Sequence, residues 1–484
     1  MTSNETAPES ATGITTQPTL TTAGMITVLL GAALPVIDFF IVNVGLPTIQ
    51  TDLHASTATL ELVVAAYGVA FAVLLVLGGR LGDAFGRRRL FLLGLALFTL
   101  TSLVCGIAPN GVTLVLARAA QGAAAALVMP QVLSIIQAGT TGEHRSRALG
   151  FYGATSGMSS LVGQLFGGSL VAADLWGTGW RPIFLVNVPI GLIGLLLARR
   201  TVPESRATNP AGVDRWGTAL LAVSLLSLLI PLTEGGSLGW PWWTLVLLVA
   251  FPFAAYGFFR VETRLEARSR MPLLPPALLR TASVRHGLAV AIPFFCGFGA
   301  FMFVYVVALQ DGLHFGPFDS GLALAPNAVA YFSMSLISSR LVARYGQKVV
   351  VAGSAIGALG FAALAGTGLL TWPNVAIWEL VPAMMVIGLG NGLAQTTLFR
   401  VVLSRVPTDL AGAGSGVLTT TQQTSMALGV AVFGGLFAAL SSGGPLDFEG
   451  AFALTFEVLA VLRVAVAVLA RKLPDPRQNG GGPA

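Results

Sequence analysis

The chain has 484 residues, of which 54% are hydrophobic and only 10% are charged. Soluble domains carry about 25% charged residues, so this chain has too little charge to cover a soluble surface. Its formal net charge of +6 would indicate a nucleic-acid partner only if the basic residues clustered on one soluble face, and their distribution along the chain excludes this. The sequence therefore predicts an all-α polytopic membrane protein.

Residues 1–22 are polar and contain no basic residue, which excludes a secretory signal peptide and predicts a disordered tail. Fourteen apolar segments follow, each long enough to cross about 30 Å of hydrocarbon as a helix. The predicted spans are 24–48, 58–79, 89–108, 111–136, 147–173, 181–199, 215–233, 241–260, 286–310, 319–341, 348–369, 374–399, 411–440 and 451–470.

The basic residues lie at regular places between these spans. Nearly all of the 27 Lys and Arg residues fall on alternate connections, apart from Arg118 and Arg463 within spans and Arg181 at an outer end. Because Lys and Arg concentrate on cytoplasmic loops, this pattern predicts that both termini are cytoplasmic. We therefore expect a multi-pass protein of the cell membrane that contacts the lipid bilayer and binds no nucleic acid.

Two long polar connections, at about 200–214 and 261–285, divide the spans into groups of six, two and six. We expect a cytoplasmic tail at 1–22, a six-helix bundle at 23–200, a linker with two extra transmembrane helices at 201–285, a second six-helix bundle at 286–470 and a cytoplasmic tail at 471–484. A weak internal repeat supports a duplicated unit, because Arg80-Leu81 and Gly86 align with Arg340-Leu341 and Gly346.

The connection after the second span, "GGRLGDAFGRRRLF" from Gly78 to Phe91, holds four arginines and one aspartate. Any basic residues there would fix the topology, but topology does not require Gly79, Asp83 and Gly86 at their spacing. Glycines permit a tight turn between helices. Asp83 can pair with a neighbouring arginine or cap the start of the third span.

Asp38 lies in the first span, about 15 Å from its outer end at 1.5 Å per residue. A carboxylate at that depth is costly unless it is paired, hydrated or protonated. Asp38 can be a reversible proton carrier, a counter-charge for a cationic substrate, or half of a static ion pair.

Arg118 lies at a similar depth in the fourth span, with Gln121 and Gly122 on its face at helical spacing. We expect Arg118 to approach Asp38 and to tune its affinity for a proton. The alternatives are a purely structural pair, or hydrogen bonds from Arg118 to backbone carbonyl groups.

Polar residues near mid-membrane also mark two later spans. Gln422 and Gln423 lie in the thirteenth span, and Asn391 and Gln395 lie in the twelfth. Such side chains either hydrogen-bond a neighbouring helix or line a wet cavity. Arg463 in the last span is expected to extend toward the inner surface.

Several catalytic and nucleotide-binding motifs are absent. The chain has no GxxxxGK[ST] phosphate loop, no HExxH motif and no CxxC pair, and its 4 histidines are scattered. We therefore expect no metal, no cofactor and no enzymatic activity. A membrane-embedded acid without an ATP site indicates a gradient-driven transporter.

Over about 24–470 the chain resembles the major facilitator superfamily, and its order of elements is similar to the fourteen-span drug:proton antiporter branch (EmrB/QacA type). The inner-loop motif G-x-L-x-D-x-x-G-R-[RK] is matched by Gly79, Leu81, Asp83, Gly86, Arg87 and Arg88. The first-span motif has Asp38 as its acid, and the fourth-span motif has Arg118, Gln121, Gly122 and Pro130. The fifth-span antiporter motif G-x-x-x-G-P-x-x-G-G keeps Gly163, Gly167 and Gly168, with Gln164 in place of the proline.

The resemblance implies two six-helix bundles around a central cavity, with two extra helices between them, and alternating access of the cavity to each side. It also implies a proton-coupling role for Arg118, an inner gate at the loop motif, and efflux of hydrophobic or cationic drugs, antibiotics or related metabolites. The partners are then a small-molecule substrate and protons, and we expect a monomer. Two alternatives remain: a proton-linked importer or facilitator of a small polar solute, and a membrane sensor or enzyme without flux.

Overall fold

The structure is a computed structural model of the whole chain, and it describes residues 19–55, 57–206, 214–235, 239–268, 272, 274, 276–407, 410–441 and 446–475. Within these residues the regular elements are helices, and no strand is present. The predicted tail at 1–22 lies outside the described residues up to residue 18, and so does the end of the predicted C-terminal tail from residue 476.

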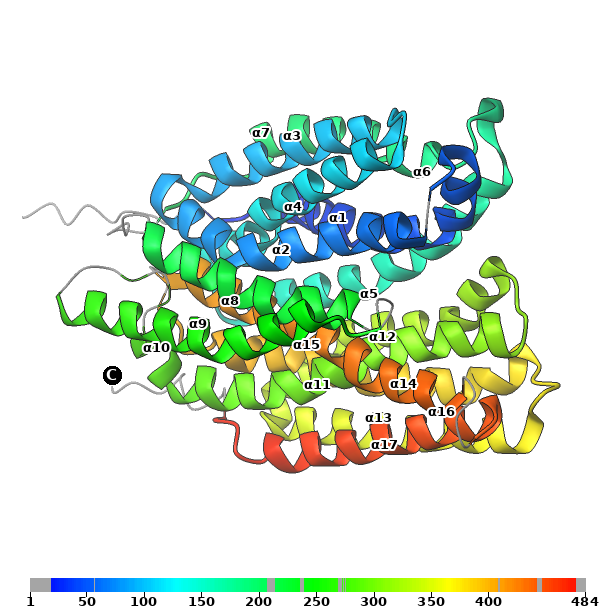
Figure 1. The fold of residues 1–484 in the computed structure, drawn as a ribbon. Helices are drawn as coiled ribbons and strands as arrows, with labels where there is room; N and C mark the ends of the chain where they lie inside the picture. Colours follow the sequence, from blue (N-terminus) through cyan, green and yellow to red (C-terminus); the bar gives the residue numbers. More distant parts are fainter. Residues whose placement is uncertain are drawn as a thin grey trace, which may run out of the picture.

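The first half of the chain forms the upper part of the molecule in Figure 1. Its helices are α1 (Thr22–Leu53), α2 (Thr57–Phe85), α3 (Arg87–Gly106), α4 (Gly111–Gly139), α5 (Gly142–Ala172), the short 3-10 helix η1 (Leu175–Gly177), α6 (Pro182–Leu185) and α7 (Asn187–Thr201). In this half α2 packs on α4, α1 on α5, and α3 on α4 and α7. The predicted sixth span is broken at Val186 into α6 and α7, which makes Asn187 the first residue of α7.

The second half forms the lower part of the molecule in Figure 1. Its elements are α11 (Ala282–Val307), η2 (Ala308–Gly312), α12 (Pro317–Tyr345), α13 (Lys348–Thr371), α14 (Ile377–Leu403), α15 (Ala411–Gly429), η4 (Val430–Gly434), α16 (Gly435–Ser441) and α17 (Phe448–Ala470). The segments η2 and η4 are π-helical turns that continue α11 and α15. In this half α14 packs on α12 and α13, α13 on α17, and α11 on α15.

Three helices connect the halves: α8 (Arg215–Glu234), α9 (Trp242–Ala267) and α10 (Pro276–Arg280). The helix α8 packs on α9 and contacts both α2 and α15, and Figure 1 shows the pair in front of the two halves. The halves also meet directly, because α5 packs on α12 and α2 packs on α15. These two contacts frame the space between the halves.

Corresponding turns in the two halves share one backbone feature. Gly86 separates α2 from α3 and has φ 106°, and Gly346 follows α12 and has φ 58°. Residues with a side chain rarely adopt such positive φ values, whereas glycine does so at little cost. The repeat seen in the sequence therefore has a structural counterpart.

Within the described residues, twelve helices are long and apolar enough to cross a membrane. The two predicted spans outside this set are 147–173 and 215–233, which the structure forms as α5 and α8. The helix α5 has 31 residues but many are Gly, Ser or charged, and the apolar described stretch of α8 is short, from Trp216 to Leu232. About twelve spans are thus supported by length and hydropathy, rather than the predicted fourteen.

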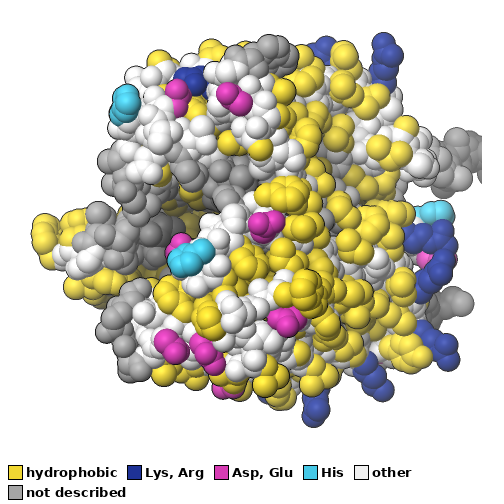
Figure 2. Space-filling model, turned by 90° about the vertical axis from the view of Figure 1, so that its right-hand side faces the viewer, with side chains coloured by type: hydrophobic (Ala, Val, Ile, Leu, Met, Phe, Trp, Pro, Cys, Tyr) yellow, Lys and Arg dark blue, Asp and Glu magenta, His cyan; other side chains and the backbone are white. Residues whose placement is uncertain are grey.

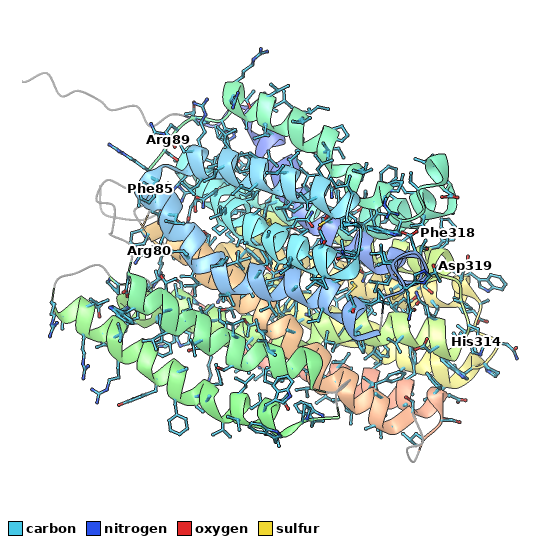
Figure 3. The ribbon with its side chains drawn as sticks, turned by 45° about the horizontal axis from the view of Figure 1, so that its top comes forward. Arg80, Phe85, Arg89, His314, Phe318 and Asp319 are labelled. Atoms are coloured by element: carbon cyan, nitrogen blue, oxygen red, sulfur yellow. The ribbon has the colours of Figure 1, made fainter. Side chains whose placement is uncertain are left out.

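The surface is divided by charge. Figure 2 shows most Lys and Arg side chains along one edge of the face, most acidic side chains elsewhere on it, and broad hydrophobic areas between them. Figure 3 shows Arg80 and Arg89 at one end of the molecule and His314 and Asp319 at the opposite end. This separation agrees with the prediction that the basic residues lie on alternate connections. We call the end with Arg80 the basic end.

Candidate functional site

A fully buried ionic cluster joins α1, α4 and α7. The side chains of Asp38 and Arg118 are both 0% exposed, and Nη1 of Arg118 donates a hydrogen bond to Oδ2 of Asp38. Oδ1 of Asp38 accepts hydrogen bonds from Nε2 of Gln121 (2.8 Å) and Nδ2 of Asn187 (2.7 Å). An ionised carboxylate only accepts hydrogen bonds, so these three donors match its chemistry. The expected approach of Arg118 to Asp38 is thus present.

Arg118 is held by more than its ion pair. Its Nε donates to the backbone carbonyl of Val63 (3.2 Å), and Nη1 also donates to Oε1 of Gln121 (2.8 Å). Its guanidinium lies over the ring of Tyr67, 4.3 Å from the centroid. Removing two charges from water costs several kcal/mol per ion, and only such additional partners offset that cost. The ion pair and the backbone contact, which the sequence left as alternatives, occur together.

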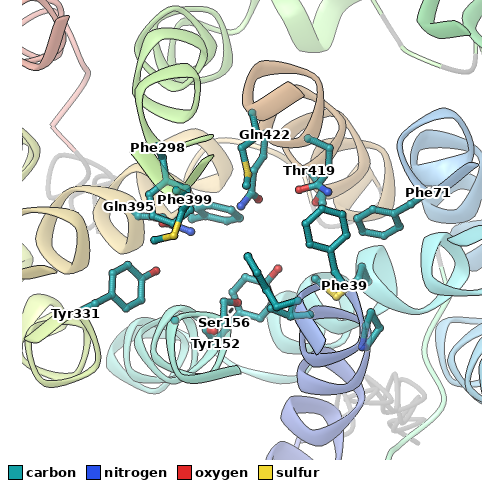
Figure 4. A pocket seen from close by; sticks show the side chains of 18 of the residues that line it. Phe39, Phe71, Tyr152, Ser156, Phe298, Tyr331, Gln395, Phe399, Thr419 and Gln422 are labelled. Atoms are coloured by element: carbon teal, nitrogen blue, oxygen red, sulfur yellow. Dashed lines mark hydrogen bonds between the residues drawn. The ribbon is translucent and has the colours of Figure 1, made fainter. Parts of the chain in front are cut away.

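A cavity lies between the two halves of the molecule (Figure 4). Its empty volume is about 910 Å³, including the open solvent that it takes in. The first half contributes Pro35, Val36, Phe39, Phe40, Tyr67, Phe71, Met129, Tyr152, Ser156 and Gly157, and the second half contributes Phe298, Met302, Asn327, Ala328, Tyr331, Gln395, Phe399, Thr419, Gln422, Gln423 and Met426. The lining is aromatic and aliphatic with a few amides and hydroxyls, and none of these residues is charged. This composition is typical of small-molecule sites.

The ionic cluster and the cavity share structural parts. Tyr67 lines the cavity, while its ring supports Arg118 and its hydroxyl donates to the carbonyl of Pro35 (3.0 Å). Val36 and Phe39, which lie two residues before and one residue after Asp38 on α1, also line the cavity. A change in the charge of Asp38 therefore acts on the same helix that forms one wall of the cavity.

The halves are hydrogen-bonded to each other near the basic end of α4. The hydroxyls of Ser134 on α4 and Ser415 on α15 lie 3.2 Å apart, and Ser415 also donates to the carbonyl of Pro130 (3.3 Å). One turn further, Nε2 of Gln137 donates to the carbonyl of Leu403 (3.1 Å). Met129 lines the cavity immediately before Pro130, so these contacts close its floor on the basic side.

Comparison with known proteins identifies the family. Residues 28–430 match the family model described as Major Facilitator Superfamily. The chain belongs to the Major Facilitator Superfamily. It is 37% identical over 415 residues to a "Probable actinorhodin transporter" of Streptomyces coelicolor, covering 85% of this chain and 72% of that protein. It is 33% identical over 475 residues to the "Cephamycin export protein CmcT" of Amycolatopsis lactamdurans, covering 96% of this chain and 95% of that protein.

A solved structure has the same fold. The human organic anion transporter MFSD10 superposes with a TM-score of 0.66 at 14% identity, covering 93% of this chain and 99% of that chain. This likeness supports an all-helical major facilitator fold and, at that identity, nothing finer. The family and the relatives named above are transporters, so the chain is a transporter and not an enzyme.

The inner-loop motif of this facilitator forms a tight junction between α2 and α3. Arg87 donates to Oδ1 of Asp83 (2.8 Å) in a pair that is 3% exposed on both sides. Asp83 therefore pairs with a neighbouring arginine, whereas the residue that caps α3 is Gly86. Sequence reasoning did not anticipate Glu204, whose Oε1 accepts from the backbone N–H of Arg88 (3.1 Å). Leu81 and Gly79 lie within α2, next to this junction.

The glycines of the fourth-span and fifth-span motifs lie where helices approach closely. A methyl group added at Gly122 would lie 2.2 Å from the carbonyl oxygen of Tyr67, and one at Gly163 would lie 2.7 Å from that of Ile37. Gly167 is equally close to Ile41, whereas Gly168 is half-buried. Gln164 belongs to α5, but its side chain lies outside the described residues.

The polar residues of the second half separate into two groups. Gln395, Gln422 and Gln423 line the cavity, but Asn391 does not. Its Oδ1 accepts instead from Nη2 of Arg463 (2.7 Å), whose guanidinium lies 4.0 Å from the ring centroid of Phe294. The expectation that Arg463 extends to the inner surface is wrong, because this residue is 1% exposed. A cation–π contact and a hydrogen bond to an amide hold the Arg463 side chain in the interior of the second half.

Proposed function

We propose that this transporter exports uncharged or weakly charged aromatic antibiotics or related metabolites in exchange for protons. This proposal rests on the observation that the Asp38–Arg118 cluster and an uncharged cavity share α1 and Tyr67. The names of the relatives support export, since one is a cephamycin export protein and another, 37% identical over 420 residues, is the "Puromycin resistance protein pur8" of Streptomyces alboniger. Actinorhodin and puromycin are therefore the first compounds to test.

In this mechanism Asp38 carries the proton. Protonation neutralises the carboxylate and weakens its bond to Arg118, because the guanidinium then faces a neutral carboxyl group and the attraction between opposite charges is lost. The released guanidinium stays over Tyr67, so α1 and the cavity wall can shift relative to α4. The two halves then expose the cavity to each side in turn, and substrate leaves as a proton enters.

The cavity lining favours hydrophobic substrates over permanent cations. None of its residues is charged. The carboxylate of Asp38 on α1 is not available as a counter-charge for a cation, because it already accepts hydrogen bonds from Arg118, Gln121 and Asn187. Burying a cation without a counter-charge is costly. Aromatic side chains such as Phe39 and Phe298 suit flat apolar molecules, and Gln395 and Gln422 can bind their polar groups.

We also propose the finer membrane arrangement. The helices α5 and α8 cross with the other twelve, which gives fourteen spans as in the EmrB/QacA branch, with six-helix bundles at 23–200 and 286–470. The basic end faces the cytoplasm of the cell together with both termini, and the protein acts as a monomer. The contacts of α5 with α1 and α12, and of α8 with α2 and α15, support this arrangement.

Transport in everted membrane vesicles with an imposed pH gradient tests the proposal. Wild-type protein should accumulate puromycin or actinorhodin when the vesicle interior is acidic, and substrate addition should release protons from the interior. Asp38→Asn, expressed at the same level, should bind substrate but lose uphill accumulation. Asp319→Asn is the matched control, since this acid lies outside the ionic cluster, at the end of the molecule opposite to the basic end (Figure 3). Uphill transport at the wild-type rate in Asp38→Asn would refute the coupling role, and movement of substrate together with protons would favour the importer.

A further inference from the structure

The connecting helices bring two carboxyl groups together at the basic end of the molecule. Asp214 precedes α8, and its Oδ1 accepts a hydrogen bond from the backbone N–H of Trp216 (3.1 Å). Glu262 lies near the end of α9 and is 0% exposed, and its Oε2 accepts from the backbone N–H of Leu274 (2.7 Å). Each carboxyl group thus has one oxygen bound by a backbone donor.

The other two oxygens face each other. Oδ2 of Asp214 and Oε1 of Glu262 are buried, and neither accepts a hydrogen bond from an N–H or hydroxyl group of the described residues. A methyl group added at Gly217 would lie 2.2 Å from each of these two oxygens. The oxygens are therefore no further apart than twice that distance, and Gly217 leaves open the space between them.

This geometry requires a proton. Two carboxylates whose facing oxygens are buried at such a separation disfavour each other's ionisation, so that the pair keeps one proton. A protonated carboxyl group donates one hydrogen bond, and the free oxygen of its partner is the acceptor that this bond needs. One shared proton thereby satisfies both oxygens that otherwise have no partner.

The pair lies beside the inner-loop motif. The charged groups that act on Glu262 are Asp214, which caps α8, and Arg80 on α2. Arg80 is 5% exposed, donates to the carbonyl of Pro272 in the linker and interacts electrostatically with Asp83. Arg80 therefore connects the carboxyl pair of the inserted helices to the motif acid on α2.

We propose that Asp214 and Glu262 form a second proton-binding site, in which one proton shared by the two carboxyl groups joins the start of α8 to α9 beside the inner-loop motif and leaves a single negative charge near Arg80. Loss of this proton leaves two negative charges that repel each other and compete with Asp83 for Arg80. The site is separate from Asp38, and it does not depend on the substrate or the direction of transport.

Infrared spectroscopy of the purified full-length protein in nanodiscs tests this site through the C=O stretching band of protonated carboxyl groups. During titration from acidic to alkaline buffer, the wild type should keep one carboxyl band after the exposed acids have ionised. Glu262→Gln and Asp214→Asn should each lose that band, and Asp38→Asn should retain it. Both variants can fold, because a Gln amide can donate to Asp214 and Asn is a good helix cap.

The thermal unfolding midpoint of each variant identifies any that fail to fold. The proposal is overturned if folded Glu262→Gln and Asp214→Asn keep the wild-type band. It is also overturned if the wild type shows no such band at a pH above the range in which ordinary carboxyl groups ionise. If Asp38→Asn does not transport but keeps this band, the carboxyl pair still holds its proton although coupling at Asp38 is lost. The two proposals are therefore tested separately.

Discussion

At the scale of single residues, the buried charge of Arg118 balances that of Asp38. Replacing Arg118 by Gln keeps hydrogen-bonding capacity but leaves the carboxylate without a counter-charge. Breaking a buried pair in this way typically costs about 3–5 kcal/mol. We expect Arg118→Gln to lower the thermal unfolding midpoint clearly at neutral pH, and by less in acid, because protonation of Asp38 removes the uncompensated charge.

The double variant Asp38→Asn/Arg118→Gln provides the control for this prediction. It removes both charges, so its loss of stability should be smaller than that of Arg118→Gln alone. The measurement is thermal unfolding in detergent, with each variant compared over the same pH range. Equal losses in the single and double variants would mean that the pair contributes no coupling energy.

Some partners of this cluster were predictable from the sequence and others were not. Depth in the membrane was enough to match Asp38 with Arg118, since both are charged and lie at a similar distance from the outer surface. Asn187 gave no such signal, because a single uncharged amide within the predicted span 181–199 offers no charge to match with Asp38. Arg463 was misjudged because its partners, an amide and an aromatic ring on other helices, leave no charge pattern in the sequence.

At the scale of helices, one contact occurs in the same form in both halves. A methyl group at Gly122 of α4 would lie 2.2 Å from the carbonyl oxygen of Tyr67, and one at Gly392 of α14 would lie 2.6 Å from that of Tyr331. Both tyrosines line the cavity. Small residues at these positions let the helix that carries the tyrosine approach its neighbour closely.

Substitution of Gly122 by Ala tests this contact. The added methyl group must displace α2, and with it Tyr67, which supports Arg118. We expect a lower unfolding midpoint and at least a severalfold loss of transport. The matched control is Gly366→Ala in α13, where an added methyl group meets no atom within 4 Å. Since Ala is favoured over Gly in helices by up to about 1 kcal/mol, this control should be neutral or stabilising.

The elements themselves were largely visible in the sequence, and their limits were not. Apolar length located the long helices that the structure forms across 24–470, including α5 and α8, but not the short helices η1 and α10, which lie in predicted connections. It did not indicate the break at Val186 or the π-helical turns η2 and η4. Hydropathy averages over a window, so it cannot detect a local change in hydrogen bonding within a continuous apolar segment.

At the scale of the whole molecule, the contacts between Ser134 and Ser415 and between Gln137 and Leu403 join the halves on the basic side of the cavity. The conformation is therefore closed on that side. If the halves rock about the cavity, these contacts must break in each cycle, and a bond that cannot break should stop transport.

A disulfide between positions 134 and 415 tests this requirement. The two hydroxyl oxygens lie 3.2 Å apart, so cysteines at these positions are near the spacing at which a disulfide forms. In a background without Cys105 and Cys296, Ser134→Cys/Ser415→Cys should lose substrate transport after oxidation and regain it on reduction. Each single cysteine variant should transport regardless of redox state. Full transport by the oxidised double variant, with the cross-link verified by mass spectrometry, would show that the basic side stays closed throughout the cycle and that the halves do not rock about this cavity.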